Sequence, residues 1–132
     1  MANILLIEPD RVLARTYGSA LERAGHKVQA ATTAQSALQL ADEVCPEVVL
    51  LELQLVAHGG VEFLYEFRSY ADWQSIPIAI VSNVPPAEFN QSVGVLRERL
   101  GVVAYCYKPQ TNLQHLQRAV EDALARQPRL AA

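Results

Sequence analysis

Four polar side chains each follow a short apolar run in this 132-residue sequence. Glu52 follows the uninterrupted apolar run Val48–Leu51, which is typical of a strand buried on both faces. The other three are Glu8, Ser82 and Lys108, which follow Ile4–Ile7, Ile78–Val81 and Ala104–Tyr107. Because the carboxyl ends of parallel strands form the ligand crevice of an α/β sheet, the pattern predicts a site with two acids, a hydroxyl and a lysine. A carboxylate in such a place is costly to bury unless a partner compensates its charge.

The elements that must position these side chains alternate between apolar runs and amphipathic stretches. We expect strands at Ile4–Ile7, Val28–Ala31, Val48–Leu51, Ile78–Val81 and Val102–Tyr107. We expect helices at Arg11–Ala24, Thr33–Val44, Val61–Ser69, Pro85–Leu100 and Asn112–Arg126. Asp10 is a predicted N-cap, Thr32 or Thr33 a second one, and Gly25 a predicted helix stop. The alternation predicts an α/β fold, with five parallel strands covered by helices on both faces.

Composition favours one globular domain without a membrane segment. Hydrophobic residues make up 51% of the chain and charged residues 19%. We expect the domain to span residues 1–127, with a short tail at 128–132. The net charge of −3 supplies no basic field for nucleic acid. Cys45 and Cys106 lie far apart in the sequence and form no CxxC pair, which suits reduced thiols in a cytosolic protein. No apolar run reaches the roughly 20 residues of a membrane span. We therefore predict a cytoplasmic protein.

Taken together, these motifs resemble the receiver domain of two-component response regulators, over about Asn3 to Arg126. The segments that carry the resemblance are Ile4–Asp10, Pro46–Leu55 with Gly60, Ile78–Ser82 and Tyr105–Pro109. The resemblance implies a (βα)5 doubly wound sheet of the flavodoxin-like kind. It also implies a module that takes a phosphoryl group from a histidine kinase onto an aspartate after the third strand.

The resemblance assigns a role to each residue of the predicted site. It implies that Glu52 occupies the phosphoacceptor position and that Glu8 and Asp10 form the acidic pocket. Ser82 and Tyr105 would occupy the two switch positions, and Lys108 the position of the family's lysine. Pro109 would occupy a position where the preceding peptide bond is often cis. Each role has a structural alternative. Glu52 with Lys108 would be a buried structural pair, Ser82 would satisfy a local backbone group, Tyr105 would pack against the core, and Asp10 would cap a helix rather than bind metal.

Two departures from the family pattern predict altered chemistry. Glu52 stands where the family has aspartate, and Pro9 stands where a second acid helps to hold Mg²⁺. Mg²⁺ demands near-ideal octahedral geometry, so a missing carboxylate weakens its site. The extra methylene of Glu52 moves its carboxylate about 1.5 Å, and a displacement of about 1 Å costs roughly a hundredfold in rate. We predict no catalytic residue, no enzymatic activity and no cofactor beyond weak Mg²⁺ binding.

The longer acid suggests a different role. Its carboxylate would lie nearer to where phosphoryl oxygens sit, would pair with Lys108, and would attract Ser82 without any phosphate. It supplies about one negative charge, against the −1.5 to −2 of a phosphate. The main hypothesis is therefore a phosphorylation-independent, protein-binding pseudo-receiver. One alternative is a conventional regulator still phosphorylated by a histidine kinase. A second is a small flavodoxin-like cofactor-binding protein, although the loop Glu8–Arg11 lacks a phosphate-cradling glycine cluster.

The resemblance also suggests where a partner binds. In the family, the output face consists of the fourth helix, fifth strand and fifth helix, here residues 85–100, 102–107 and 112–126. Phe89, Val93 and Leu96 are candidate contacts, unless they face the core. We expect a histidine kinase or an effector protein as partner, no direct nucleic-acid or membrane binding, and a monomer or weak homodimer. Trp73 is either an exposed anchor or a lid over the sheet edge.

Overall fold

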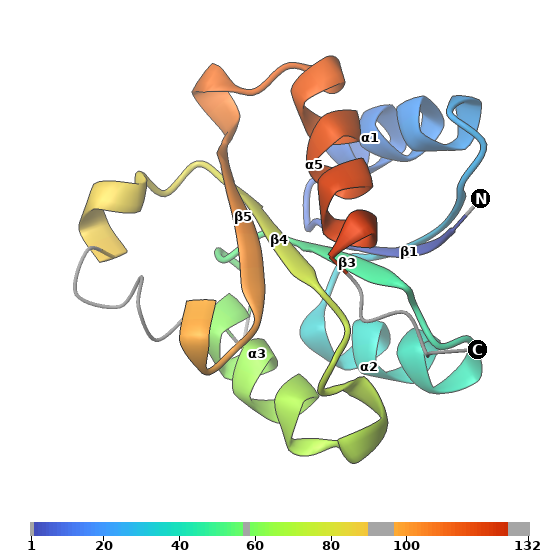
Figure 1. Cartoon of the computed structure of the whole chain (residues 1–132). Coiled ribbons are helices and arrows are strands. Elements are labelled where there is room, and N and C mark those ends of the chain that lie inside the picture. The colour runs from blue at the N-terminus through green and yellow to red at the C-terminus, as the bar shows by residue number, and fades with distance from the viewer. Residues whose placement is uncertain (1, 57–58, 90–96, 127–132) are drawn as a thin grey trace.

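Five parallel strands form one sheet in the order β2-β1-β3-β4-β5 (Figure 1). The computed structural model describes residues 2–56, 59–89 and 97–126. The strands are β1 Asn3–Ile7, β2 Lys27–Ala31, β3 Val48–Leu51, β4 Ile78–Ser82 and β5 Val102–Tyr107. The helices are α1 Arg11–Arg23, α2 Ala34–Glu43, α3 Gly60–Ser69 and α5 Leu113–Ala125. Short 3₁₀ turns occur at η1 Ala71–Trp73, η2 Pro86–Phe89 and η3 Lys108–Gln110.

Helices cover both faces of the sheet, which confirms the doubly wound α/β fold expected from the sequence. Figure 1 shows α1 and α5 on one face and α2 and α3 on the other. Successive strand side chains point to opposite faces, so Leu5 and Val49 join the core under α2 and α3, whereas Ile4 and Leu50 join the core under α1 and α5. Burial from both sides explains why the three central strands, β1, β3 and β4, are nearly continuous apolar runs rather than alternating ones.

Local capping sets the helix ends that the sequence predicted. The Asp10 carboxylate accepts the backbone N–H groups of Val12 and Leu13, at 2.9 and 3.1 Å, and so caps α1. Gly25, with φ of 98°, follows the last residues of that helix. Thr33 rather than Thr32 caps α2. Such caps satisfy backbone donors that have no partner within the helix.

The segment between β4 and β5 is described in part. The helix expected over residues 85–100 begins as the 3₁₀ turn η2. Val93, Leu96 and the side chain of Phe89 lie outside the part of the chain that the structure describes, as does the expected tail at 128–132. Among the described helices, none has the length and apolar character needed to cross a bilayer.

Trp73 is not an exposed anchor, the first of the two alternatives that the sequence left open, but a buried residue. Its side chain lies in the core under α2 and α3 with 7% of its surface exposed, and its ring stacks on Phe67 at a centroid distance of 4.8 Å. The ring of Tyr70 lies tilted against it, also at 4.8 Å. The connector before β4 is therefore a packed corner of the core.

The Arg68 guanidinium stabilises this corner by donating hydrogen bonds to backbone carbonyls. Its Nη1 donates to the carbonyl of Trp73 and its Nη2 to that of Ile76, both at 2.5 Å. Its Nε donates to the carbonyl of Leu100 at 2.8 Å. Burial lowers the pKa of Arg68 to about 10, so the group keeps its charge at neutral pH. One side chain thereby joins the end of α3 to the entrances of β4 and β5.

We expect Arg68→Met to lower the free energy of unfolding by about 3 kcal/mol, because several buried carbonyls lose a charged donor at once. Urea denaturation followed by far-UV circular dichroism measures the change. Arg23→Met is the matched control, since Arg23 is exposed at the end of α1 and should change stability by no more than about 0.5 kcal/mol. Equal losses of unfolding free energy in the two variants would contradict a stabilising role for the Arg68 hydrogen bonds.

Candidate functional site

The ammonium group of Lys108 lies between two buried carboxylates at the carboxyl edge of the sheet. Its Nζ donates to Glu8 Oε1 at 2.5 Å and to Glu52 Oε1 at 2.8 Å. The side chain of Lys108 is 8% exposed, while Glu8 and Glu52 are 2% and 4% exposed. These three side chains, called the acid–lysine cluster below, follow strands β1, β3 and β5. The predicted ion pair between Glu52 and Lys108 is present, and Glu8 is a second partner that the sequence did not reveal.

Backbone N–H groups hold the remaining carboxylate oxygens. Glu8 Oε2 accepts from Asp10 N at 3.0 Å, and Glu52 Oε2 accepts from Gln54 N at 3.3 Å. Both donors lie two residues after the acid, in the loops that leave β1 and β3. Every oxygen of the two carboxylates therefore has a partner, which is the condition under which buried charge is tolerated.

The cluster raises the pKa of Lys108 above its ordinary value of 10.5. Burial by itself lowers that pKa, but the hydrogen bonds and negative charges of Glu52 and Glu8 outweigh burial. The half-buried phenol of Tyr17 on α1 also lies within the field of this cluster. Burial raises the pKa of Tyr17, Lys108 opposes the rise, and Glu8 and Glu52 add to it.

The start of α3 packs directly against the segment that carries Glu52. Gly60 N donates to the carbonyl of Leu53 at 2.8 Å. A Cβ on Gly60 would lie 2.6 Å from the Cα of Leu53 and 3.0 Å from the carbonyl oxygen of Glu52. Glycine is thus required at position 60 for space, whereas a Cβ on Gly59 would meet nothing within 4 Å.

The donor groups of the cluster do not suit Mg²⁺, the ion that the family pattern implies. Both carboxylates of the cluster already bind the Lys108 ammonium. Pro9 offers no side-chain ligand, and the Asp10 carboxylate already accepts backbone N–H groups of the first turn of α1. Across residues 2–56, 59–89 and 97–126, no three histidine, cysteine or acidic side chains come together as metal ligands. A hard cation that needs several oxygen ligands finds too few here.

Asp10 and Ser82 make the local contacts that the sequence offered as alternatives to their family roles. The Asp10 carboxylate is exposed and caps α1, so it is not part of an acidic pocket with Glu8. The expected attraction of Ser82 to Glu52 is also wrong, since no hydrogen bond joins the two within the described ranges. Ser82 is buried, and its Oγ accepts from Val84 N at 3.1 Å. The chain turns directly after β4, and the hydroxyl closes that turn locally.

Tyr105 and Pro109 flank the lysine at the end of β5. Tyr105 is half-buried against the core under α2 and α3, and its hydroxyl donates to the carbonyl of Val84 at 2.6 Å. The expected cis bond before Pro109 is wrong, because the described residues contain no cis peptide bond. Pro109 lies within η3, where Thr111 N donates to the Lys108 carbonyl at 3.1 Å and Thr111 Oγ1 to that of Tyr107 at 2.7 Å. These bonds form with a trans peptide.

Fold and site together define a class: a doubly wound α/β protein with its charged site at the carboxyl edge of a parallel sheet. The sequence model of the response regulator receiver domain family matches residues 4–121 of this chain. The chain therefore belongs to the receiver-domain family of two-component signalling, which agrees with the resemblance in the sequence.

Comparison with single proteins agrees with this assignment. The KDP operon transcriptional regulatory protein KdpE of Escherichia coli K12 is 29% identical over 126 residues, which are 96% of this chain and 52% of KdpE. The chain thus spans about half the length of that relative.

Two solved structures show the same fold. A sensor protein from Polaromonas sp. JS666 has a TM-score of 0.85 at 21% identity, with 96% of this chain and 98% of that chain covered. The chemotaxis protein CheY4 of Vibrio cholerae has a TM-score of 0.84 at 22% identity, with 94% and 99% covered.

We expect Lys108→Met to lower the free energy of unfolding by about 3–5 kcal/mol, because two buried carboxylates lose their counter-charge. Glu52→Gln should cost much less, since the pair of Glu8 and Lys108 stays neutral. Urea denaturation at pH 7 measures both, with Lys27→Met on an exposed lysine as control.

The pH dependence of the Lys108→Met effect provides a second measurement. A lysine whose pKa is raised by folding stabilises the protein fully below its ordinary value of 10.5, and the stabilisation is lost as pH rises through the folded-state pKa. The difference between wild type and Lys108→Met should therefore be constant from pH 7 to about pH 10 and shrink above that. A difference that does not shrink would contradict the charge pairing.

We expect Gly60→Ala to cost about 2 kcal/mol or more, because the new methyl group would overlap backbone that cannot move without shifting Glu52. Gly59→Ala provides the matched control. Gly59 is an N-cap with φ of −67° and open space around it, so this change should cost about 1 kcal/mol or less. Backbone amide spectra of Gly60→Ala should show shifts at residues 52–54, which Gly59→Ala lacks. Similar stability of the two variants would refute the close-packing argument.

Proposed function

We propose that this chain is a phosphorylation-independent receiver, in which the Glu52 carboxylate stands permanently where the family carries a transient phosphoryl group. One observation supports this most directly. The Lys108 ammonium is bonded to Glu52 and to Glu8 inside a buried cluster, with no phosphate or metal needed. The carboxylate is therefore held at the end of β3 by the protein itself.

The electrostatics of the cluster disfavour transfer of a phosphoryl group to Glu52. Two carboxylates already surround one ammonium, so an arriving dianion would bring more negative charge without a second cation. Phosphoryl transfer depends on positioning and on neutralising developing charge. The donor set around Pro9 does not suit the Mg²⁺ that would neutralise it. We therefore expect no enzymatic activity, no resident cofactor and at most weak Mg²⁺ binding.

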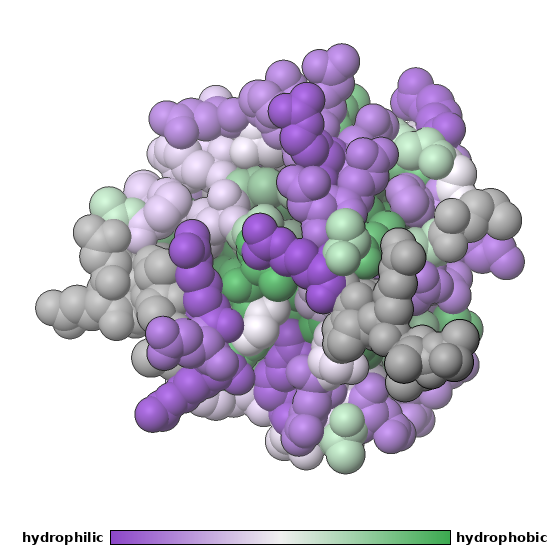
Figure 2. Space-filling view, viewed as in Figure 1, coloured by the Kyte–Doolittle hydropathy of each residue, from purple (hydrophilic) through white to green (hydrophobic). Residues whose placement is uncertain are grey.

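The proposed output is protein binding through the surface of β5 and α5. Lys108 follows β5 and opens η3, and Asn112 then caps α5, so a short tight turn links the cluster to this surface. A shallow cavity of about 200 Å³ lies between the two elements. It is lined by Val103, Ala104, His115, Arg118, Ala119, Asp122, Ala123 and Arg126. Figure 2 shows apolar surface near the middle of this face, framed by hydrophilic side chains.

Receiver domains exchange signals with kinases or effector proteins, and we propose such a protein as partner for this surface. An apolar centre inside a polar rim is typical of protein interfaces. We further propose a cytoplasmic monomer or weak homodimer that binds neither nucleic acid nor membrane directly.

We expect wild-type protein to gain no phosphoryl group from acetyl phosphate with Mg²⁺, or to gain it at least about a hundredfold more slowly than a restored variant. The restored variant is Pro9→Asp with Glu52→Asp, which returns both acids of the family pattern. Intact-mass spectrometry over time measures the label, and hydroxylamine should remove it because an acyl phosphate is labile.

Labelling of wild type as fast as the restored variant would instead favour a conventional regulator phosphorylated on Glu52. A second readout separates signalling from a merely structural ion pair. Glu52→Gln should shift the backbone amide resonances of β5 and α5, whereas beryllofluoride with Mg²⁺ should leave wild type unchanged. No shift in Glu52→Gln would mean that the pair only stabilises the fold.

A further inference from the structure

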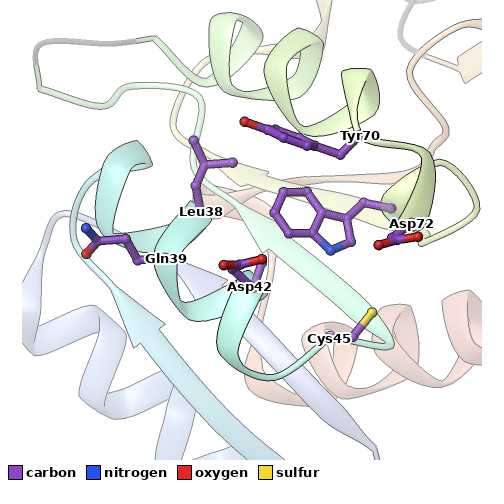
Figure 3. A pocket seen from close by; sticks show the side chains of 8 residues that line it. Leu38, Gln39, Asp42, Cys45, Tyr70 and Asp72 are labelled. Carbon is purple, nitrogen blue, oxygen red and sulfur yellow. The ribbon is translucent and has the colours of Figure 1, made fainter.

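A second cavity opens at the amino edge of the sheet, opposite the acid–lysine cluster. It lies between α2, the segment that leads from α2 into β3, and η1, and its volume is about 500 Å³. Its lining consists of Leu38, Gln39, Ala41, Asp42, Cys45, Tyr70, Asp72 and Trp73. Figure 3 shows Asp42 and Asp72 on two sides of this space, with Tyr70 above it and Leu38 reaching in from α2.

The indole N–H of Trp73 lacks an acceptor in this cavity. Trp73 is 93% buried, since 7% of its surface is exposed, yet its Nε1 makes no hydrogen bond within the described ranges. Phe67 and Tyr70 both lie against the indole ring. Within the described residues every fully buried side-chain nitrogen is hydrogen-bonded, so the unbonded Nε1 keeps some accessible surface, and Trp73 lines this cavity. A donor that stays accessible on an otherwise buried side chain can donate to a ligand that carries an acceptor.

The same cavity is strongly acidic and continues into a second one. Asp42 and Asp72 are both exposed carboxylates of its lining. Beyond Leu38 lies a cavity of about 430 Å³ between α2 and α3, whose lining includes Glu62 and Glu66. Neither lining contains lysine, arginine or histidine. We call these two adjoining cavities the acidic groove.

Other chemistry at this groove is disfavoured. Partial burial raises the pKa of the Cys45 thiol, and the negative charges of Asp72 and Glu47 raise it further. A thiol that stays protonated is a poor nucleophile and a poor metal ligand. The nearby Arg68 cannot neutralise the groove by rotation, because its guanidinium is bound to backbone carbonyls.

We propose that the acidic groove binds a basic, arginine-containing segment of a partner protein. An arginine guanidinium lies between Asp42 and Asp72, where its planar fork meets carboxylate oxygens. A backbone carbonyl of the same segment accepts the indole N–H of Trp73. The chain then continues across Leu38 towards Glu66. A peptide fits this groove better than a small organic cation does. A basic peptide carries both a cation for the aspartates and a backbone carbonyl for the indole N–H, and it is long enough to span the two cavities.

The single tryptophan makes this site directly observable. In a ¹H–¹⁵N correlation spectrum of the full chain, Trp73 gives one indole resonance. We expect a saturable shift of that resonance when a short acetylated and amidated peptide of alanines with two arginines is added. A peptide with citrulline in place of arginine keeps shape and carbonyls but loses the charge, and should bind at least about fivefold more weakly.

Matched variants locate the binding. Asp42→Asn and Asp72→Asn should each weaken the arginine peptide about two- to fivefold, as expected for exposed charge pairs. Asp122→Asn on α5, also exposed, should not change the affinity. Trp73→Phe, followed through the amide resonances of α2, should bind more weakly because the indole donor is gone. Glu52→Gln should bind the arginine peptide like wild type. The result of this test is therefore independent of the proposed receiver function.

Four outcomes would overturn the proposal. One is an indole resonance that does not shift with the arginine peptide. Another is equal binding of the citrulline peptide, or equal binding by both aspartate variants. The last is binding of arginine amide as tightly as the peptide, which would assign the groove to a small organic cation.

Discussion

One ammonium group holds together the carboxyl edge of this sheet. Lys108 extends from the end of β5 across β4 to the acids that follow β3 and β1, so three of the five strands end at one buried charge. Its pairing with two carboxylates satisfies the lysine, and backbone N–H groups satisfy the oxygens that remain. Without the ammonium, two carboxylates would face each other out of water, an arrangement far more costly than the loss of one hydrogen bond.

The two edges of the sheet hold their cations by different chemistry. At the carboxyl edge, Lys108 faces full negative charges, which raise its pKa. At the amino edge, Arg68 faces neutral backbone carbonyls, and burial lowers its pKa. The planar guanidinium suits several carbonyls spread around it, whereas the compact ammonium suits two convergent acids. Arg68 therefore closes a corner of the fold, while Lys108 sets the charge of the site.

The sequence predicted the fold well because most elements carry a strong local pattern. Continuous apolar runs marked the strands other than β2, and Asp10, Thr33 and Gly25 marked helix ends within one or two residues. Polar residues after strands also located the cluster, since topology alone brings strand ends together. The pairing of Glu52 with Lys108 followed from charge.

What the sequence could not predict depends on contacts between distant segments. Nothing local indicates that Glu8 shares Lys108 with Glu52, because the strand order and the reach of the lysine decide it. The sequence could not choose between an exposed and a covered Trp73 and gave no sign of the role of Arg68, because both follow from the tertiary packing of α3 against η1. For Ser82 the sequence left two partners open, and the local turn prevails because it costs less entropy to close than a long-range contact.

The cluster and the acidic groove are joined by β3, and its rigidity limits communication between them. All four residues of β3 are fully buried, and the strand pairs with β1 and β4 on its two sides. Coupling between sites needs an element with two arrangements whose equilibrium both sites bias. A strand packed on both faces and bonded on both edges offers one arrangement. The carboxylate at its end is held by Lys108 whether or not the groove is filled. Under the two proposals, filling the acidic groove should therefore leave the cluster unchanged.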